Sequence, residues 1–152
     1  MSLNLNAAEL KVGYVQVDKI LKEAPQTAES GKKLEREFSP RSLELDKVKK
    51  QITAIEATLD KEALTLSDAE RRNKQRQASN LKIEFQRKQR ELREDINIRK
   101  NEELSILQDR INTAVKTVSE ADGYDLVMYS GVAYASTKID ITDKVLKLLS
   151  GK

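Results

Sequence analysis

The chain has 152 residues, of which 38% are hydrophobic, 35% are charged and 4% are aromatic. This composition excludes a large compact core, because an average globular domain is roughly 45–50% apolar and about 25% charged. The absence of Cys and His excludes disulfides, thiolate nucleophiles and the commonest general base. Regularly spaced Leu, Ile and Val, with few Pro and Gly, favour long solvated helices over disorder.

The first element is an alternation of apolar and other residues over 12–17, which predicts a β-strand. Asp18 follows it and is expected to cap a short helix that contains Leu21 and Ala24. Pro25 is expected to end this helix, because the residue before a proline disfavours helical geometry.

The next segment, 26–121, predicts an antiparallel helical hairpin, a coiled-coil arm. From Leu45 to Leu59 the apolar residues are spaced 3-4-3-4, which is a heptad seam. Pro40 predicts a kink or a short break without ending the arm, because proline inside a helix costs ~3 kcal/mol. The seam of the first helix consists of Leu34, Phe38, Leu45, Val48, Ile52, Ile55 and Leu59.

The tip of the arm is expected at 64–68. Ser67 and Glu70 form a capping-box pattern that predicts the start of the second helix. Gly123 is expected to stop that helix. The seam of the second helix consists of Ala78, Leu81, Phe85, Leu92, Ile96, Leu104, Leu107, Ile111, Ala114 and Val118.

The C-terminal part, 122–150, predicts two strands, 124–129 and 132–135, around a tight turn. A last amphipathic helix is expected over 144–149, with Thr142 or Asp143 as its cap. The fold class is therefore mainly α with a small β-body made from 11–25 and 122–150. So few short strands cannot bury a stable core alone, which predicts that several chains complete the body.

Basic residues gather on the returning helix of the arm. Between residues 71 and 93 nine basic groups face only Glu84 and Glu91, which gives a net charge of +7. Such a helix can contact nucleic acid, anionic lipid or acidic protein, and a solvated charged face is an equally open interpretation. The nine are Arg71, Arg72, Lys74, Arg76, Lys82, Arg87, Lys88, Arg90 and Arg93.

Motifs of catalysis are not found. The sequence has no G-x-G-x-x-G, G-x-S-x-G or H-E-x-x-H pattern. We therefore expect no enzyme, no catalytic residue, no cofactor or nucleotide, and no bound metal.

Three stretches carry a resemblance to a known family: Leu34-Glu35-Arg36-Glu37-Phe38, then Arg110 to Lys116, then the C-terminal pattern from Tyr124-Asp125-Leu126-Val127 to Leu146. With the order of strand, helical hairpin, strands and helix, the chain resembles the Skp/OmpH family of periplasmic chaperones from Lys11 onward. The C-terminal strand pattern attached to the arm makes the resemblance specific.

The resemblance implies a homotrimer with a shared β-body and three arms around a cavity. It implies an ATP-independent holdase that keeps unfolded outer-membrane proteins from aggregating in the periplasm, with a secretion leader that is not part of this sequence. Lipopolysaccharide or an anionic membrane surface is a further implied partner, with Lys88 and Arg99 as candidate contacts. Ile98 departs from the basic residue expected there, which puts this site in doubt.

In the implied trimer, the nine basic residues would contact the client or an anionic surface. The body contacts between chains are assigned to Val15, Val17, Leu126, Val127, Tyr134 and Ile139. Phe38, Leu43 and Phe85 are assigned to the hairpin core in preference to client contact. The alternative functions are a nucleic-acid-binding or scaffolding coiled coil that uses helix 71–93, and a prefoldin-like holdase. A prefoldin-like chain would place its strands inside the hairpin, not at the chain ends.

Overall fold

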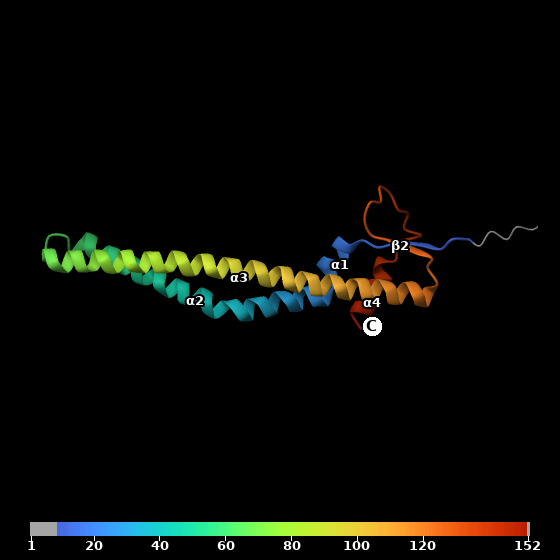
Figure 1. The fold of residues 1–152 in the computed structure, drawn as a ribbon, viewed down its shortest axis with the longest axis horizontal. Coiled ribbons are helices and arrows are strands. Elements are labelled where there is room, and N and C mark those ends of the chain that lie inside the picture. The colour runs from blue at the N-terminus through green and yellow to red at the C-terminus, as the bar shows by residue number, and fades with distance from the viewer. Residues whose placement is uncertain (1–8, 152) are drawn as a thin grey trace, which may run out of the picture. The chain divides into compact units, whose positions relative to one another are not determined.

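The computed structural model describes residues 9–151 and is drawn in Figure 1. Long helices dominate it, with two short strands near the ends of the chain. In chain order the elements are β1 (Val12–Tyr14), α1 (Val17–Glu23), α2 (Pro25–Lys61), α3 (Asp68–Asp122), β2 (Leu126–Met128) and α4 (Thr142–Leu149). The mainly helical fold class with a small β part is confirmed.

Two compact units make up the chain. Among the described residues, the body unit comprises 9–31 and 102–151, and the hairpin unit comprises 32–101. The first turns of α2 and the last part of α3 thus belong to the body unit. In the described part of the chain, no helix combines the length and the apolar character needed to cross a membrane.

The sheet of the body unit is built around β1. This strand pairs in parallel with β2, with Val12 opposite Leu126 and Tyr14 opposite Met128. On the other side of β1, the Tyr14 amide donates to the carbonyl of Ile139 at 2.8 Å. β1 is therefore flanked on both sides, whereas β2 has no second neighbouring strand among residues 9–151.

The core of the body unit lies where α1, α4 and the end of α3 meet. Val15, Ile20 and Val145 are completely buried. From α3 the core takes residues spaced three or four apart, the helical period that the sequence predicts. These α3 residues are Leu107, Ile111, Ala114, Val115 and Val118.

In the hairpin unit, α2 and α3 run side by side (Figure 1). Pro40 does not end the arm, as predicted, and it causes no break, because α2 is continuous from Pro25 to Lys61. The kink expected there as the other possibility stays a prediction. The predicted capping box is confirmed. The Glu70 amide donates to Ser67 Oγ at 3.2 Å, and the Ser67 amide donates to Glu70 Oε2 at 2.9 Å. The hydrogen bonds from Ser67 lower the pKa of Glu70.

Gly123 directly follows the last residue of α3, as predicted. Its φ is +66°, in the left-handed region that glycine adopts without the steric penalty of a Cβ. The Tyr124 amide then bonds back to the carbonyl of Ser119 at 2.9 Å, which satisfies one of the free carbonyls at the helix end.

The predicted strand over 132–135 is wrong, and so is the antiparallel strand pair around the tight turn. Residues 132–135 are irregular, and β2 pairs in parallel with β1 instead. β2 is also shorter than the predicted 124–129. A strand needs a neighbour for its amides and carbonyls, and no described residue of the chain offers one to 132–135.

Both predicted helix caps in the body unit are wrong. The strand predicted over 12–17 ends at Tyr14, and α1 already begins at Val17, so Asp18 lies in its first turn. α4 begins at Thr142, two residues before the predicted start, and its N-cap position is Ile141. The stabilising carboxylate there comes from Asp140, which accepts a hydrogen bond from the Thr142 amide at 2.9 Å.

Candidate functional site

The seam of the hairpin unit is only partly buried from solvent. Phe38 and Ile52 on α2 and Ala78 and Leu92 on α3 are buried, and the other predicted seam residues of this unit are half-buried. Two helices can shield only one narrow stripe from water, which explains this shallow burial. Leu43 is 58% exposed and does not belong to the hairpin core to which the sequence analysis assigned it.

One predicted seam residue lies outside the seam. Leu104, in the body unit, is 43% exposed, whereas its neighbour Glu103 is buried. The Glu103 carboxylate accepts a hydrogen bond from Ser30 Oγ at 3.0 Å, across from α2. A buried carboxylate needs such partners, and sequence spacing gave no signal for this one because Ser30 is 73 residues away.

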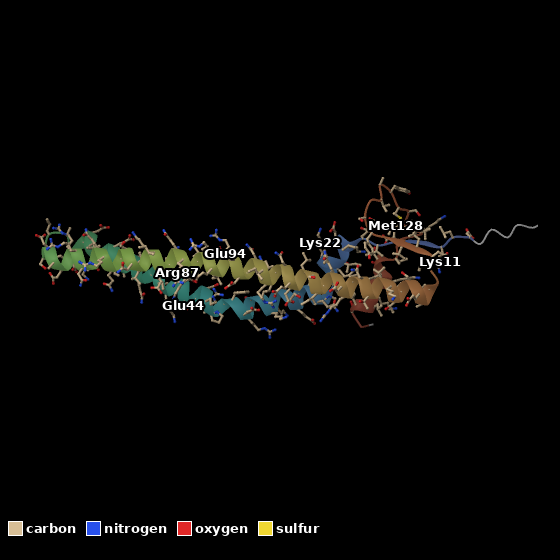
Figure 2. All side chains as sticks on the ribbon, in the orientation of Figure 1. Lys11, Lys22, Glu44, Arg87, Glu94 and Met128 are labelled. Carbon is tan, nitrogen blue, oxygen red and sulfur yellow. The ribbon has the colours of Figure 1, made fainter. Side chains whose placement is uncertain are left out.

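Ion pairs connect the two helices at several levels of the hairpin unit. Figure 2 shows charged side chains along both helices, with Glu44 on α2 and Arg87 and Glu94 on α3. The polarity of the pairs varies along the hairpin, so neither helix supplies only one sign. The pairs are Arg99–Glu37 at 3.2 Å, Arg41–Asp95 at 2.6 Å, Lys88–Glu44 at 2.6 Å, and Lys82–Glu56.

The nine predicted basic contact residues fall into two groups. Four are in ion pairs: Arg71 with Asp68, Lys82 with Glu56, Arg87 with Glu91, and Lys88 with Glu44 and Glu84. The other five have no ion pair with any described residue. These five are Arg72, Lys74, Arg76, Arg90 and Arg93.

The two candidate lipopolysaccharide contacts both belong to pairs between the helices. The Lys88 ammonium lies against Glu44 and Glu84, and these hydrogen bonds raise its pKa. The same contact with Lys88 lowers the pKa of Glu44. Arg99 Nε lies 3.2 Å from Glu37 Oε1, with the Arg99 side chain only 24% exposed. An anion at either position must therefore compete with a carboxylate of α2.

The six residues predicted to join chains in the body have different surroundings. Val15 is fully buried inside the core of its own chain, and Val17, Val127 and Ile139 are half-buried. Leu126 and Tyr134 are exposed, with Tyr134 at 83%. Leu126, together with the nearby Met128, lies on β2, the strand with an unpaired edge. These exposed side chains are the part of the predicted set that another chain can reach.

Asp140 is an organising residue that the sequence analysis missed. Its carboxylate accepts hydrogen bonds from the Thr142 hydroxyl at 2.5 Å and from Gln16 Nε2 at 2.6 Å. Burial raises the pKa of Asp140, but these hydrogen bonds outweigh it, so the pKa lies below its usual value. The Gln16 amide in turn donates to Thr142 Oγ1 at 2.9 Å. This network joins the start of α1 to the start of α4.

Several known proteins are similar to this chain. Residues 11–149 match the family model described as Outer membrane protein (OmpH-like). The chaperone protein Skp of Pectobacterium atrosepticum is 31% identical over 147 residues, which cover 96% of this chain and 88% of that protein. The chaperone protein Skp of Escherichia coli K12 is 30% identical over 139 residues, covering 90% and 84%.

A solved structure shares the fold. A chain from Caulobacter crescentus CB15 described as OmpH-like superimposes with a TM-score of 0.80. The superposition covers 95% of this chain and 86% of that one, at 17% sequence identity. The two chains thus share the arrangement of helices and strands although few of their residues are identical.

Proposed function

Because the chain belongs to the OmpH-like family, a family of chaperones and not of enzymes, we propose that it is an ATP-independent holdase. In this proposal it binds unfolded outer-membrane proteins in the periplasm and keeps them from aggregating. The observation that carries the proposal is the match over residues 11–149, which includes the hairpin and both parts of the body. The chaperone character of the relatives supports it.

The holdase would act as a homotrimer. One edge of β2 is unpaired among residues 9–151, Leu126 and Met128 on this strand are exposed, and Tyr134 in the irregular segment that follows is exposed as well. Unpaired strand edges and exposed apolar side chains favour association with another chain. A neighbouring chain would also supply the partner that residues 132–135 lack within their own chain.

Client binding would use many weak contacts along the hairpin unit. The exposed aliphatic side chains there are isolated, for example Leu43, Ile83 and Ile98. The unpaired basic residues of α3 would attract acidic parts of a client, or an anionic surface, over a range that salt shortens. Weak contacts of this kind allow release without ATP.

Lipopolysaccharide would be a secondary partner at Lys88 and Arg99. Its phosphates would replace Glu44 and Glu37 as the partners of these cations, so its binding would loosen the contact between α2 and α3. Glu44→Gln is then expected to strengthen lipopolysaccharide binding. A decrease on this substitution would speak against Lys88 as the contact.

The holdase proposal is tested by aggregation suppression. An unfolded outer-membrane β-barrel protein is diluted from denaturant with and without the chain, in the absence of ATP, and light scattering is followed. We expect scattering to fall with increasing chain concentration and to rise again with salt. Unchanged scattering at an excess of the chain would refute the proposal.

The trimer is tested separately by light scattering coupled to size exclusion at micromolar concentration. Tyr134→Asp and Leu126→Asp place charge on the exposed part of the body, and we expect both variants to shift the mass toward the monomer. The matched control is Leu43→Asp, which changes a leucine of the hairpin unit whose exposure, 58%, lies between those of Leu126 and Tyr134. A wild-type monomer would contradict the proposed assembly.

A further inference from the structure

One face of α3 in the hairpin unit carries arginines and no acidic residue. The face is made of positions spaced alternately four and three residues apart, beginning with Arg72. Residues with this spacing lie on one side of a helix, and here that side is opposite the seam. Every one of these positions is exposed. The residues are Arg72, Arg76, Ser79, Ile83, Gln86, Arg90, Arg93 and Asn97, which we call the arginine stripe.

The stripe separates the basic residues of α3 by their partners. All four of its arginines are without an ion pair to any residue in 9–151. Between residues 71 and 93, the basic residues that do form ion pairs are Arg71, Lys82, Arg87 and Lys88, and all four lie off the stripe. Paired cations are already neutralised by a neighbour, so between residues 71 and 93 the arginines that remain open to an external anion are those of the stripe.

We propose that the arginine stripe binds an acidic, extended segment of unfolded polypeptide, a partner that rests on the holdase function proposed above. The guanidinium groups pair with Asp and Glu carboxylates, and Ile83, in the middle of the stripe, contacts an apolar side chain between them. Lys82 and Lys88 pair with carboxylates of α2, whereas Arg71 and Arg87 pair within α3. None of these four residues takes part in this capture.

The spacing of the stripe fits such a segment. Arg72 and Arg76 form one pair, and Arg90 and Arg93 form another. Two heptads separate Arg76 from Arg90, which corresponds to ~21 Å along the helix axis. An extended chain rises ~3.3 Å per residue, so about six residues span the gap. Ile83, 64% exposed, lies halfway, where a residue of that span would meet it.

A polypeptide fits the stripe better than a lipid headgroup layer does. An unfolded chain brings carboxylates and apolar side chains in one strand, which matches the order of arginine pair, isoleucine and arginine pair. A headgroup layer supplies phosphates to the arginines but leaves Ile83 among polar groups, at a cost in free energy. The guanidinium fork binds carboxylates and phosphates alike in a bidentate manner, so Ile83, not the arginines, is the feature that favours a polypeptide.

The test compares two variants that lose the same charge. The stripe variant combines Arg72→Gln, Arg76→Gln, Arg90→Gln and Arg93→Gln. The control variant combines Arg71→Gln, Lys82→Gln, Arg87→Gln and Lys88→Gln. Circular dichroism checks the helix content of both. If the control variant loses helix, two double variants are compared instead. One combines Arg72→Gln and Arg76→Gln, and the other combines Arg71→Gln and Arg87→Gln.

The probe is a labelled peptide in which two Asp pairs flank a short apolar segment, and its affinity is measured by fluorescence anisotropy. We expect the stripe variant to bind about tenfold more weakly and the control variant to stay close to the wild type. The same peptide with Asn in place of Asp is expected to bind the wild type as weakly as the stripe variant binds the Asp peptide.

Other results would overturn the proposal. Equal losses in the two variants would mean that net charge, not the stripe, attracts the peptide. If the stripe variant binds phosphatidylglycerol vesicles more weakly than the wild type but binds the peptide equally well, the stripe is a lipid-binding surface. Because peptide binding is measured apart from aggregation, a wild type that binds the peptide but suppresses no aggregation would refute only the holdase function.

Discussion

The body unit and the hairpin unit are stabilised in different ways. In the body unit, Val15, Ile20 and Val145 are fully buried and β1 has hydrogen-bonded neighbours on both sides. In the hairpin unit, a narrow seam is half-open to solvent, and exposed ion pairs accompany it. Burial of apolar surface dominates folding free energy, whereas exposed ion pairs contribute little. The difference indicates that the hairpin unit opens locally at lower free energy than the body unit.

The largest expected effect is the loss of stability when a buried side chain is truncated in the core of each unit. Ile111→Ala in the body unit leaves a closed cavity, so we expect a loss near the upper end of ~2–5 kcal/mol. Leu92→Ala in the hairpin unit is expected near the lower end, because water and neighbouring side chains fill the space. Urea unfolding measures both values. A loss for Leu92→Ala equal to that for Ile111→Ala would contradict the proposed difference between the units.

The second prediction uses two glycines. A Cβ at Gly13 would lie 3.1 Å from Ile141 Cδ1 and 3.3 Å from Val127 Cγ2. We expect Gly13→Ala to cost ~1–3 kcal/mol by overpacking the body core. Gly31 lies within α2 and has open space around it, so Gly31→Ala should stabilise the chain by ~0.5–1 kcal/mol. Thermal unfolding of the two variants should therefore shift in opposite directions.

The third prediction concerns the tip of the hairpin. Ser67→Ala removes the cap of α3, and we expect a loss of ~1 kcal/mol, confined to the first turns of that helix. Hydrogen exchange of the amides in 68–74 measures it, with Ser79→Ala as the control on the exposed face. Protection that is unchanged in 68–74 would show that the capping box does not stabilise the tip.

The same capping box gives a pH dependence. The pKa of Glu70 is lowered in the folded chain. The ionised carboxylate therefore contributes to the free energy of unfolding fully above the ordinary pKa of glutamate. This contribution is lost as the pH falls from that value through the lowered pKa. The protection of the amides at the start of α3, measured relative to their intrinsic exchange rates at each pH, should therefore fall on acidification, and less so in Glu70→Gln.

The smallest expected effect is at the ion pair between Lys88 and Glu44. The pKa of Glu44 is lowered, so the stability that the ion pair contributes is lost as the pH falls through this lowered pKa. The pKa of Lys88 is raised, so the same stability is lost on the alkaline side only at strongly alkaline pH. Glu44 is exposed and Lys88 is only half-buried, so solvent screens the pair. Glu44→Gln should therefore change the melting temperature only slightly, and high salt should remove the difference. A large change that salt does not affect would contradict this account.

The sequence by itself determined the features that depend on neighbours within a few residues. The capping box of Ser67 and Glu70 and the stop at Gly123 are local, so they placed both ends of α3 correctly. The heptad spacing from Leu45 to Leu59 and the helical spacing of Leu107, Ile111 and Ala114 depend only on helix geometry. The resemblance to the chaperone family also rests on short stretches of sequence, and the match over residues 11–149 confirms it.

Only the tertiary structure decided the features that need a distant partner. Residues 132–135 have strand-like alternation, but no neighbouring strand is present among the described residues, so no strand forms. Asp140 was missed because Gln16, which contacts it, is 124 residues away in the chain. For the nine basic residues between 71 and 93, composition gives only their summed charge. The positions of acidic side chains around the folded helix decide which of them remain unpaired.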